Sequence, residues 1–433
     1  MKDDRTTIAA WCTYDWANSA FTTLVVTFIY STYFVQAFAD DPDTGTAFWS
    51  RGIVVSSILI AVLSPVLGAA ADRGGARRKF LIISTLVCVA ATTVLAFITP
   101  DQSNAVLTAL TVFVIANVAF EVGMVFYNAF LPAVVSPERI GRVSGYGWGL
   151  GYAGGLVCLV VALLVFVGLP GSDPLLALST EDAFNVRATN LLVAGWFLIF
   201  SLPIFLWVRD SAKGASVSIG VPETGRSPLR QAFTDLKVTA QKIRHYRQII
   251  RFLLARLVYN DGLVTVFAFA GIYASGTFDF TQSDIIVFGI VINVAAGLGA
   301  WVFGIMDDRR GGKSTIMVSL VALSVATLIA VLAPGRPWLW VAGIGIGIFA
   351  GPNQSASRSL MGRFVPERHQ SEFFGLFAFS GKATAFLGPL LLGILSEAYG
   401  QRVGVSVVVL FFLAGGALLW TVDEKEGIEA AKG

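Results

Sequence analysis

Residues 68–79 read GAAADRGGARRK and residues 304–313 read GIMDDRRGGK, so the chain carries a similar charged pattern twice. Each copy follows one long apolar run and immediately precedes another. An apolar run of roughly 20 residues is long enough to cross the hydrocarbon core of a bilayer as a helix. Each copy is therefore predicted to form a tight, positively charged turn between two membrane-spanning helices.

The composition places the whole chain in the membrane class. Of 433 residues, 55% are hydrophobic and only 14% are charged, whereas a soluble domain has about 25% charged residues. The mean hydropathy is +0.72. The apolar runs are continuous and do not alternate with polar residues, which favours helices over a membrane barrel. We predict an all-α membrane protein with twelve transmembrane helices, near residues 9–37, 50–71, 79–99, 104–131, 143–169, 188–208, 250–275, 283–306, 314–333, 337–360, 371–397 and 402–421.

Lysine and arginine are distributed unevenly between the two sides of these helices. With both termini on one side, 25 of the 31 basic residues fall on that side and four on the other, while Arg256 and Lys382 lie within spans. By the positive-inside rule, both termini and the basic loops are predicted to be cytoplasmic. The basic loops are thus a topology signal, and no nucleic-acid partner is expected.

The predicted spans divide into two six-helix halves, residues 1–208 and 250–433, joined by a polar segment at 209–249. Residues 211–228 are rich in Gly, Ser and Pro, which is typical of a flexible linker. Residues 229–246 space apolar side chains three and four apart, which predicts an amphipathic helix on the inner membrane face.

Three sequence echoes indicate that the halves arose from one duplicated unit. Asn18 and Asp261, Tyr30 and Tyr273, and the Pro-Glu-Arg sequences at 137–139 and 366–368 occur in the same order in both halves. Parallel six-helix repeats of this kind are the arrangement of the major facilitator halves.

The repeated hairpin is expected to form a latch between the halves on the cytoplasmic side. Gly68 allows its helix to pack closely against a neighbour. Asp72, at the end of that helix, is placed to accept hydrogen bonds from the N-terminus of a nearby helix. The basic residues would meet lipid phosphate and cytoplasmic water. The residues assigned to this latch are Gly68, Asp72, Arg73, Arg77, Asp308 and Arg309.

The hairpin resembles the signature loop of the major facilitator superfamily, although Ala76 separates Gly75 from the basic pair. Further stretches resemble the vacuole-effluxer branch, which includes autophagy-associated vacuolar amino-acid exporters and bacterial relatives. These stretches are YDWANSAF at 14–21, FYNAFLP at 126–132, RIGRVSG at 139–145, YNDG at 259–262, EFFGL at 372–376 and FSGKAT at 379–384. The resemblance implies a major facilitator fold, with spans 1, 4, 7 and 10 lining a central cavity, in a bacterial plasma (inner) membrane.

Polar side chains deep inside the predicted spans are the candidate substrate and coupling residues. An ionisable group at that depth costs several kcal/mol unless it is paired or hydrated. Five of these residues, spread over both halves, lie roughly 13–26 Å from their entry faces at the rise of a helix. The full candidate set is Asp15, Asn18, Glu121, Tyr127, Asn128, Arg256, Asn260, Asp261, Asn353, Gln354 and Lys382.

Each candidate also has a purely structural interpretation. Asp261 and Lys382 could form an ion pair that only fixes the packing of the second half. Glu121 could carry a coupled proton, or could simply pair with Arg256 or with a backbone donor. The asparagines and Gln354 could bind substrate or could hydrogen-bond between helices.

Residues 149–154, GLGYAG, match the dinucleotide-binding pattern G-x-G-x-x-G, but they lie inside a predicted membrane span with no preceding strand. Glycines at such positions are expected to let helices approach closely. The chain has no phosphate-loop motif, and its cysteines and histidines show no metal-binding spacing. We therefore expect neither ATP, another cofactor nor a metal.

These observations predict a secondary active transporter that moves a small polar solute by alternating access, and not an enzyme. A site with charges of both signs suits a zwitterion, the resemblance suggests amino-acid export, and Glu121 or Asp261 would couple to protons. The alternatives are an exporter of amphiphiles or drugs, and a membrane receptor or lipid-handling protein that moves no solute. The expected partners are the small-molecule substrate, protons and membrane lipid, and a monomer is favoured.

Overall fold

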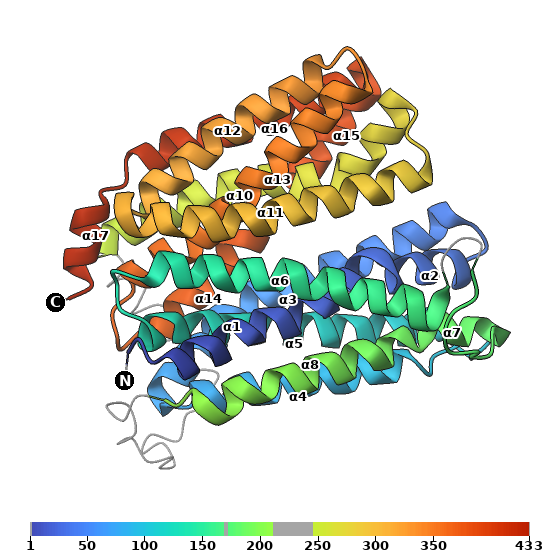
Figure 1. Ribbon diagram of the computed structural model, residues 1–433, viewed down its shortest axis with the longest axis horizontal. Helices are drawn as coiled ribbons and strands as arrows, with labels where there is room; N and C mark the ends of the chain where they lie inside the picture. The colour runs from blue at the N-terminus through green and yellow to red at the C-terminus, as the bar shows by residue number, and fades with distance from the viewer. Residues whose placement is uncertain (1, 169–171, 211–245, 433) are drawn as a thin grey trace.

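The structure, a computed structural model, describes residues 2–168, 172–210 and 246–432. The secondary structure of these residues is helical throughout. Figure 1 shows two bundles, one built from the first half of the chain and the other from the second. The amphipathic helix predicted at residues 229–246 lies, except for Tyr246, outside the described residues.

The first bundle consists of long helices joined by short connections. Its elements are α1 (Arg5–Ala20), η1 (Phe21–Phe28), α2 (Tyr30–Ala37), α3 (Pro42–Gly74), α4 (Arg77–Leu95), α5 (Ala105–Val134), α6 (Ile140–Ala162), η2 (Leu163–Val167), η3 (Glu181–Ala183), α7 (Phe184–Arg187) and α8 (Thr189–Trp207). The second bundle consists of α10 (Arg247–Phe278), α11 (Gln282–Arg310), α12 (Gly312–Leu332), α13 (Arg336–Phe364), α14 (Gln370–Lys382), α15 (Leu387–Tyr399), α16 (Gln401–Trp420) and α17 (Glu424–Ala430).

Eleven helical segments among the described residues are long and apolar enough to cross a membrane. The remaining predicted span corresponds to α13, which carries more polar residues but has 29 residues and would extend about 44 Å. Most of its C-terminal half is buried, packed in part against α11 and α12. Its polar side chains therefore face protein and not lipid. The prediction of an all-α, multi-pass membrane protein with twelve spans is confirmed.

The two basic turns have the predicted form. α3 ends at Gly74, and Gly75 adopts a φ of 54°, in the left-handed region that glycine tolerates best. In the second copy, Gly311, with a φ of 90°, separates α11 from α12. Ala76, which departs from the superfamily pattern, is the residue immediately before α4.

Two spans are interrupted near their middle. The first span consists of α1, the π-helix η1 and α2, and the eleventh consists of α14 and α15 with a break at residues 383–386. Short π-helical segments frequently occur at functional sites, and interrupted helices form midplane binding sites in transporters. The two interruptions indicate where a site should lie.

The glycines of α6 serve two different interfaces. A Cβ atom added at Gly145 would lie 2.4 Å from the carbonyl oxygen of Ala300 in α11. A Cβ atom added at Gly154 would lie 2.4 Å from the carbonyl oxygen of Trp16 in α1. The GLGYAG sequence is thus part of a closely packed membrane helix, and not a nucleotide loop.

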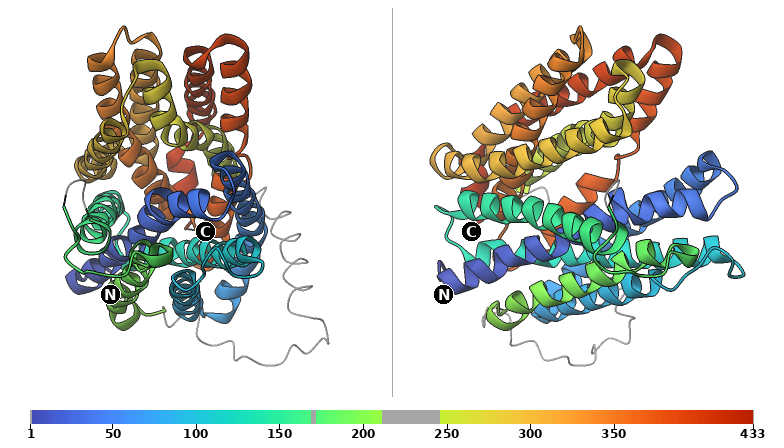
Figure 2. Two further views of the ribbon diagram at one scale, coloured as in Figure 1. Left: turned by 90° about the vertical axis from the view of Figure 1, so that its right-hand side faces the viewer. Right: turned by 45° about the vertical axis from the view of Figure 1, so that its right-hand side comes forward.

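The bundles contact each other mainly through α3 with α14 and through α6 with α11. Figures 1 and 2 show that they lie close together near the chain termini and diverge toward the opposite end. We refer to the end that carries both termini as the terminal side and to the opposite end as the distal side.

Candidate functional site

A cavity of about 340 Å³ lies between the bundles. Its lining comes from α1, α5, α10 and α13, which are spans 1, 4, 7 and 10 as the resemblance implies, together with α6 and α14. A second cavity, of about 440 Å³, shares Ser19, Thr22 and Trp148 with the first and continues to Phe28 and Gly271. Together they form a path from the middle of the protein toward the distal side.

The first charged pair in this cavity joins the two bundles. Lys382 Nζ, on the last residue of α14, lies 2.7 Å from Glu121 Oε1 on α5. The two side chains are 31% and 22% exposed, and both line the cavity. Because a helix break follows Lys382 directly, this ammonium lies at the end of a rigid helix and next to open space.

Asp261 is not the partner of Lys382, so the interpretation as an Asp261–Lys382 pair is wrong. Its carboxylate is buried and accepts a hydrogen bond of 3.2 Å from Thr384. Thr384 lies within the break after α14, two residues beyond Lys382. The break therefore separates the two side chains, with Lys382 facing the cavity and Thr384 contacting α10.

The second charged pair also joins the bundles. Arg358 of α13 is 2% exposed and places Nη1 2.9 Å from Asp15 Oδ2 of α1. Its Nε and Nη2 donate to the side-chain and carbonyl oxygens of Ser144 in α6, at 2.9 Å and 2.7 Å. The guanidinium carbon lies 4.7 Å from the ring centroid of Trp11. Ionic, hydrogen-bonding and cation–π contacts from two helices of the first bundle, α1 and α6, thus hold this arginine.

Two asparagines extend the second pair toward the cavity. Asn18 Nδ2 donates to Asp15 Oδ1 at 3.3 Å, and Asn128 Oδ1 accepts from Arg358 at 3.5 Å. Both asparagines line the cavity. They give the buried pair a polar surface that a solute can reach.

Asn353 is the least satisfied polar side chain of the predicted set. It is 0% exposed and lines the cavity, yet neither amide atom has a hydrogen-bond partner within the described part of the chain. The neighbouring Gln354 reaches Tyr152 at 3.5 Å, and Asn260 donates to the carbonyl oxygen of Gly381 at 3.0 Å. A buried amide without partners costs about 1–3 kcal/mol, so Asn353 is well suited to bind a polar ligand.

Arg256 is held by hydrogen bonds and a cation–π contact, and Tyr127 is held by aromatic stacking. Arg256 lines the cavity but donates to the carbonyl oxygen of Phe377 at 2.7 Å and to Ser380 Oγ at 2.9 Å, and it stacks 3.6 Å from the Phe377 ring centroid. It forms no ion pair with Glu121, which pairs with Lys382 instead. Tyr127 stacks on Trp11 with ring centroids 4.5 Å apart, behind Arg358.

At the terminal side, Asp72 contacts the start of α14. Its Oδ2 accepts from the backbone N–H of Glu372 at 2.9 Å, and its Oδ1 accepts from Arg77 Nε at 2.9 Å. Arg77 also donates to the side chain of Gln370 and to the carbonyl oxygen of Glu367. The expected contact between Asp72 and a helix N-terminus is present.

The second hairpin makes the symmetric contact with α6. Asp308 Oδ1 accepts from the backbone N–H of Gly141 at 2.8 Å, and Oδ2 lies 2.5 Å from Arg142 Nε. Arg363 Nη2 lies 3.6 Å from the same carboxylate. Of the other two predicted latch residues, Arg73 donates to the carbonyl oxygen of Ala69 in its own helix, and Arg309 is exposed.

A substitution at Gly68 tests whether the contacts between α3 and α14 keep the terminal side closed. A Cβ atom there would lie 2.2 Å from the carbonyl oxygen of Ser371, so Gly68→Ala forces α3 and α14 apart. Overpacking of this kind costs about 1–3 kcal/mol, which shifts an equilibrium by roughly 5- to 150-fold. We expect a cysteine placed at the buried Ser371 to react faster with a maleimide in Gly68→Ala than in the parent. Gly195→Ala is the control, since its added Cβ meets nothing within 4 Å; equal rates in all three proteins would contradict the latch.

The profile of the family described as "Vacuole effluxer Atg22 like" matches residues 44–432. The chain belongs to this family. A relative from Bacillus subtilis (strain 168), described as "Uncharacterized MFS-type transporter YxiO", is 28% identical over 98% of this chain and 96% of its own length. Autophagy-related protein 22-1 of Neosartorya fischeri is 26% identical over 66% of this chain. The chain spans about half of that fungal relative's length, 48%.

Solved structures confirm the predicted fold of this chain. The major facilitator superfamily transporter FucP, in the outward conformation, superposes with a TM-score of 0.74 at 13% identity over 97% of this chain and all of its own. The proton:xylose symporter XylE superposes with a TM-score of 0.75 at 12% identity over 99% and 98% of the two chains. The chain thus belongs to the Atg22-like family and has the fold of these major facilitator superfamily structures.

Arg358 lines the cavity but is absent from the predicted candidate set. The charge distribution assigns it to the loops of the terminal side, although the tenth predicted span reaches residue 360. The structure places it in the core of α13, four residues after Gln354. Positions four apart lie on the same face of a helix, so this spacing was the signal that Arg358 faces the cavity. Arg363, also counted as a loop residue, is buried against Asp307.

Proposed function

We propose that this protein transports a small zwitterionic solute, of which amino acids are the leading class, by alternating access. The observation that carries the proposal is the division of charge in the cavity. The first bundle supplies two carboxylates, Asp15 and Glu121, and the second supplies their cationic partners, Arg358 and Lys382. A solute with one ammonium and one carboxylate group can exchange with such partners without leaving a buried charge unpaired.

The more accessible pair is the better candidate for solute exchange. Lys382 and Glu121 are 31% and 22% exposed, whereas Arg358 and Asp15 are 2% and 7% exposed. We assign the solute carboxylate to Lys382 and the solute ammonium to Glu121. Asn353, whose amide has no partner in the described part of the chain, would complete the site. The charged and amide side chains, set among otherwise largely apolar walls, favour a polar solute over an amphiphile or drug.

The orientation of the closed side is part of the proposal. The excess of basic residues near the termini assigns the terminal side to the cytoplasm. With Asp72 and Asp308 engaged there, the described arrangement corresponds to an outward-open state. Transport would require release of both hairpins and rocking of residues 1–208 against residues 250–433, with 209–249 as the connection.

Proton coupling follows from the same pair. A protonated Glu121 cannot pair with the solute ammonium, so protonation from the distal path would release the solute to that side, and loss of the proton at the terminal side would let solute bind there. An inward proton movement could thereby drive solute export. Asp261, buried at the helix break, is the second candidate for the proton.

Reconstituted flux tests the proposal. We expect proteoliposomes to move labelled amino acids from a mixture faster when a pH gradient is imposed, and we expect Glu121→Gln or Asp261→Asn to lose that gradient dependence. Glu397→Gln, on an exposed carboxylate of α15, is the matched control and should behave as the parent. Gradient-driven flux in both test variants would exclude the coupling. Absence of amino-acid flux in correctly inserted parent protein would exclude the substrate class.

A further inference from the structure

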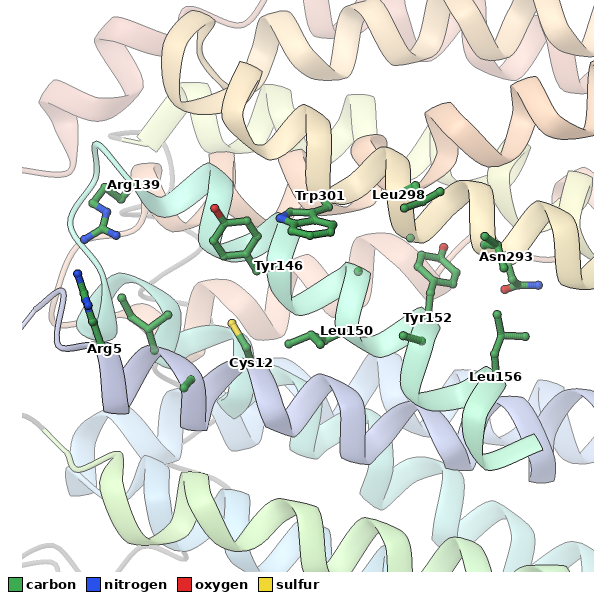
Figure 3. Close-up of a pocket in the computed structure, with 16 residues that line it drawn as sticks. Arg5, Cys12, Arg139, Tyr146, Leu150, Tyr152, Leu156, Asn293, Leu298 and Trp301 are labelled. Carbon is green, nitrogen blue, oxygen red and sulfur yellow. The ribbon is translucent and has the colours of Figure 1, made fainter. Parts of the chain in front are cut away.

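A separate groove, of about 640 Å³, lies on the periphery of the bundles between α1, α6 and α11. Figure 3 shows it crossing α6, with α1 on one side and α11 on the other. Its walls are largely apolar and include Ile8, Leu150, Leu156, Leu298 and Trp301. Leu150, Leu298 and Trp301 are 41%, 55% and 55% exposed, so the groove opens toward the surface that the bilayer covers.

The depth of the groove matches one leaflet of a membrane. Its lining residues on α6 run from Arg139, just before the helix, to Leu156. Seventeen residues of helix rise roughly 25 Å, and one leaflet with its headgroups is roughly 20–22 Å thick, half of a bilayer of 40–45 Å. The groove begins at the terminal side, where the headgroups of that leaflet would lie.

Two arginines stand at the headgroup end of this apolar groove. Figure 3 shows Arg5 and Arg139 together at that end, while Tyr152 and Asn293 lie at the other. Arg5 is exposed and forms no ion pair with any described residue. The side chain of Arg139 is 45% exposed, and among the described residues its one ionic partner is Asp3, at 3.6 Å.

The carboxylates near these arginines already have hydrogen-bond partners within the protein. Asp3 accepts from the backbone N–H of Ser136 at 3.3 Å as well as facing Arg139. Asp4 caps α1 by accepting from the backbone and the hydroxyl of Thr7, and these hydrogen bonds lower the pKa of Asp4. Guanidinium donors are thus left for an external anion, and a guanidinium fork matches the geometry of a phosphate.

We propose that this groove is a binding site for a membrane phospholipid, with its phosphate between Arg5 and Arg139 and an acyl chain along Leu150, Leu298 and Trp301. The walls come from both bundles, α1 and α6 from the first and α11 from the second. A lipid in the groove therefore contacts both bundles where α6 packs against α11. Because it binds this arrangement better than one in which the two helices are apart, it stabilises the arrangement in which they are packed.

Native mass spectrometry of the purified full chain tests this site with two lipids of identical acyl chains, phosphatidylglycerol and diacylglycerol. We expect the parent to retain one phosphatidylglycerol with at least about ten-fold higher affinity than the double variant Arg5→Ala/Arg139→Ala, because each basic group near the surface contributes substantially to binding of a phosphate. The control Arg310→Ala/Lys425→Ala removes two exposed basic residues of the same side that do not line the groove.

The apolar part of the site has its own matched pair. Ala153→Phe fills the groove, whereas Val157→Phe places the same aromatic side chain at an exposed position of α6 outside it. We expect only Ala153→Phe to weaken lipid binding. A second readout is the thermal unfolding midpoint, which phosphatidylglycerol should raise in the parent and not in Arg5→Ala/Arg139→Ala.

Three results would overturn the proposal. The first is equal retention of phosphatidylglycerol by the parent and by Arg5→Ala/Arg139→Ala. The second is equal binding of diacylglycerol and phosphatidylglycerol by the parent, which would show that no phosphate is recognised. The third is a rise of the parent's thermal unfolding midpoint with inorganic phosphate alone, which would indicate a small-anion site. None of these outcomes depends on which solute the protein carries.

Discussion

Lys382→Ala is expected to lower the solute flux of reconstituted protein by roughly 10- to 150-fold. This range corresponds to loss of one hydrogen bond to a charged group, about 1.5–3 kcal/mol. Lys382 Nζ contacts Glu121 at 2.7 Å and faces the cavity. Its removal therefore takes away the ammonium proposed to bind the solute carboxylate and leaves Glu121 without its cationic partner. Initial rates in proteoliposomes, normalised to inserted protein, measure the effect.

Two further variants separate the loss of a ligand from the loss of a pair. Glu121→Gln/Lys382→Met removes both charges, so we expect it to be as stable as the parent but still inactive. Lys425→Ala, an exposed lysine of α17, is the control for loss of a positive charge and should keep the parental rate. Parental flux in Lys382→Ala would contradict the assignment of this residue to the site.

Arg358→Ala is expected to have the largest effect on stability, about 3–5 kcal/mol, which is typical when one partner of a buried ion pair is removed. Asp15 would remain buried without its cation, and Ser144 would lose two hydrogen bonds. The free energy of unfolding in a denaturant titration, or the midpoint of thermal unfolding in detergent, measures the loss.

A double variant tests whether the charge itself is responsible. Asp15→Asn/Arg358→Met replaces the pair with neutral side chains of similar size, so we expect it to recover much of the stability that Arg358→Ala loses. Arg358→Lys should recover little, because lysine cannot donate to Asp15 and Ser144 with a planar fork. Equal stability of Arg358→Ala and the parent would show that the pair does not hold the bundles together.

The fold could be predicted because each transmembrane helix needs a long apolar run and each basic turn follows such a run. The twin hairpins, read as turns from sequence, are formed around Gly75 and Gly311. α13 was predicted as a span although its polar residues lower its hydropathy, because the apolar run before them was long enough.

Nine of the eleven candidate residues, all but Tyr127 and Asp261, line the cavity, but their pairing could not be predicted. Depth along the spans selected Glu121, Gln354 and Lys382, and all three line one cavity. The depth of a residue along its helix does not say which way its side chain points. It therefore could not show that, at the break after α14, Lys382 contacts Glu121 and Thr384 contacts Asp261. Arg358 was missed for a different reason, since a residue near a predicted helix end was assigned to a loop.

The most direct test of the account is a pair of spin–spin distances, measured by double electron–electron resonance with and without an amino-acid mixture. One pair of labels sits on the distal side, at the exposed Thr32 and Ser275, and the other on the terminal side, at the exposed Gly74 and Arg368. Alternating access around a zwitterion site predicts that amino acids shorten the distal distance and lengthen the terminal one. The account would be contradicted if amino acids left both distances unchanged while an amphiphile changed them in the same protein.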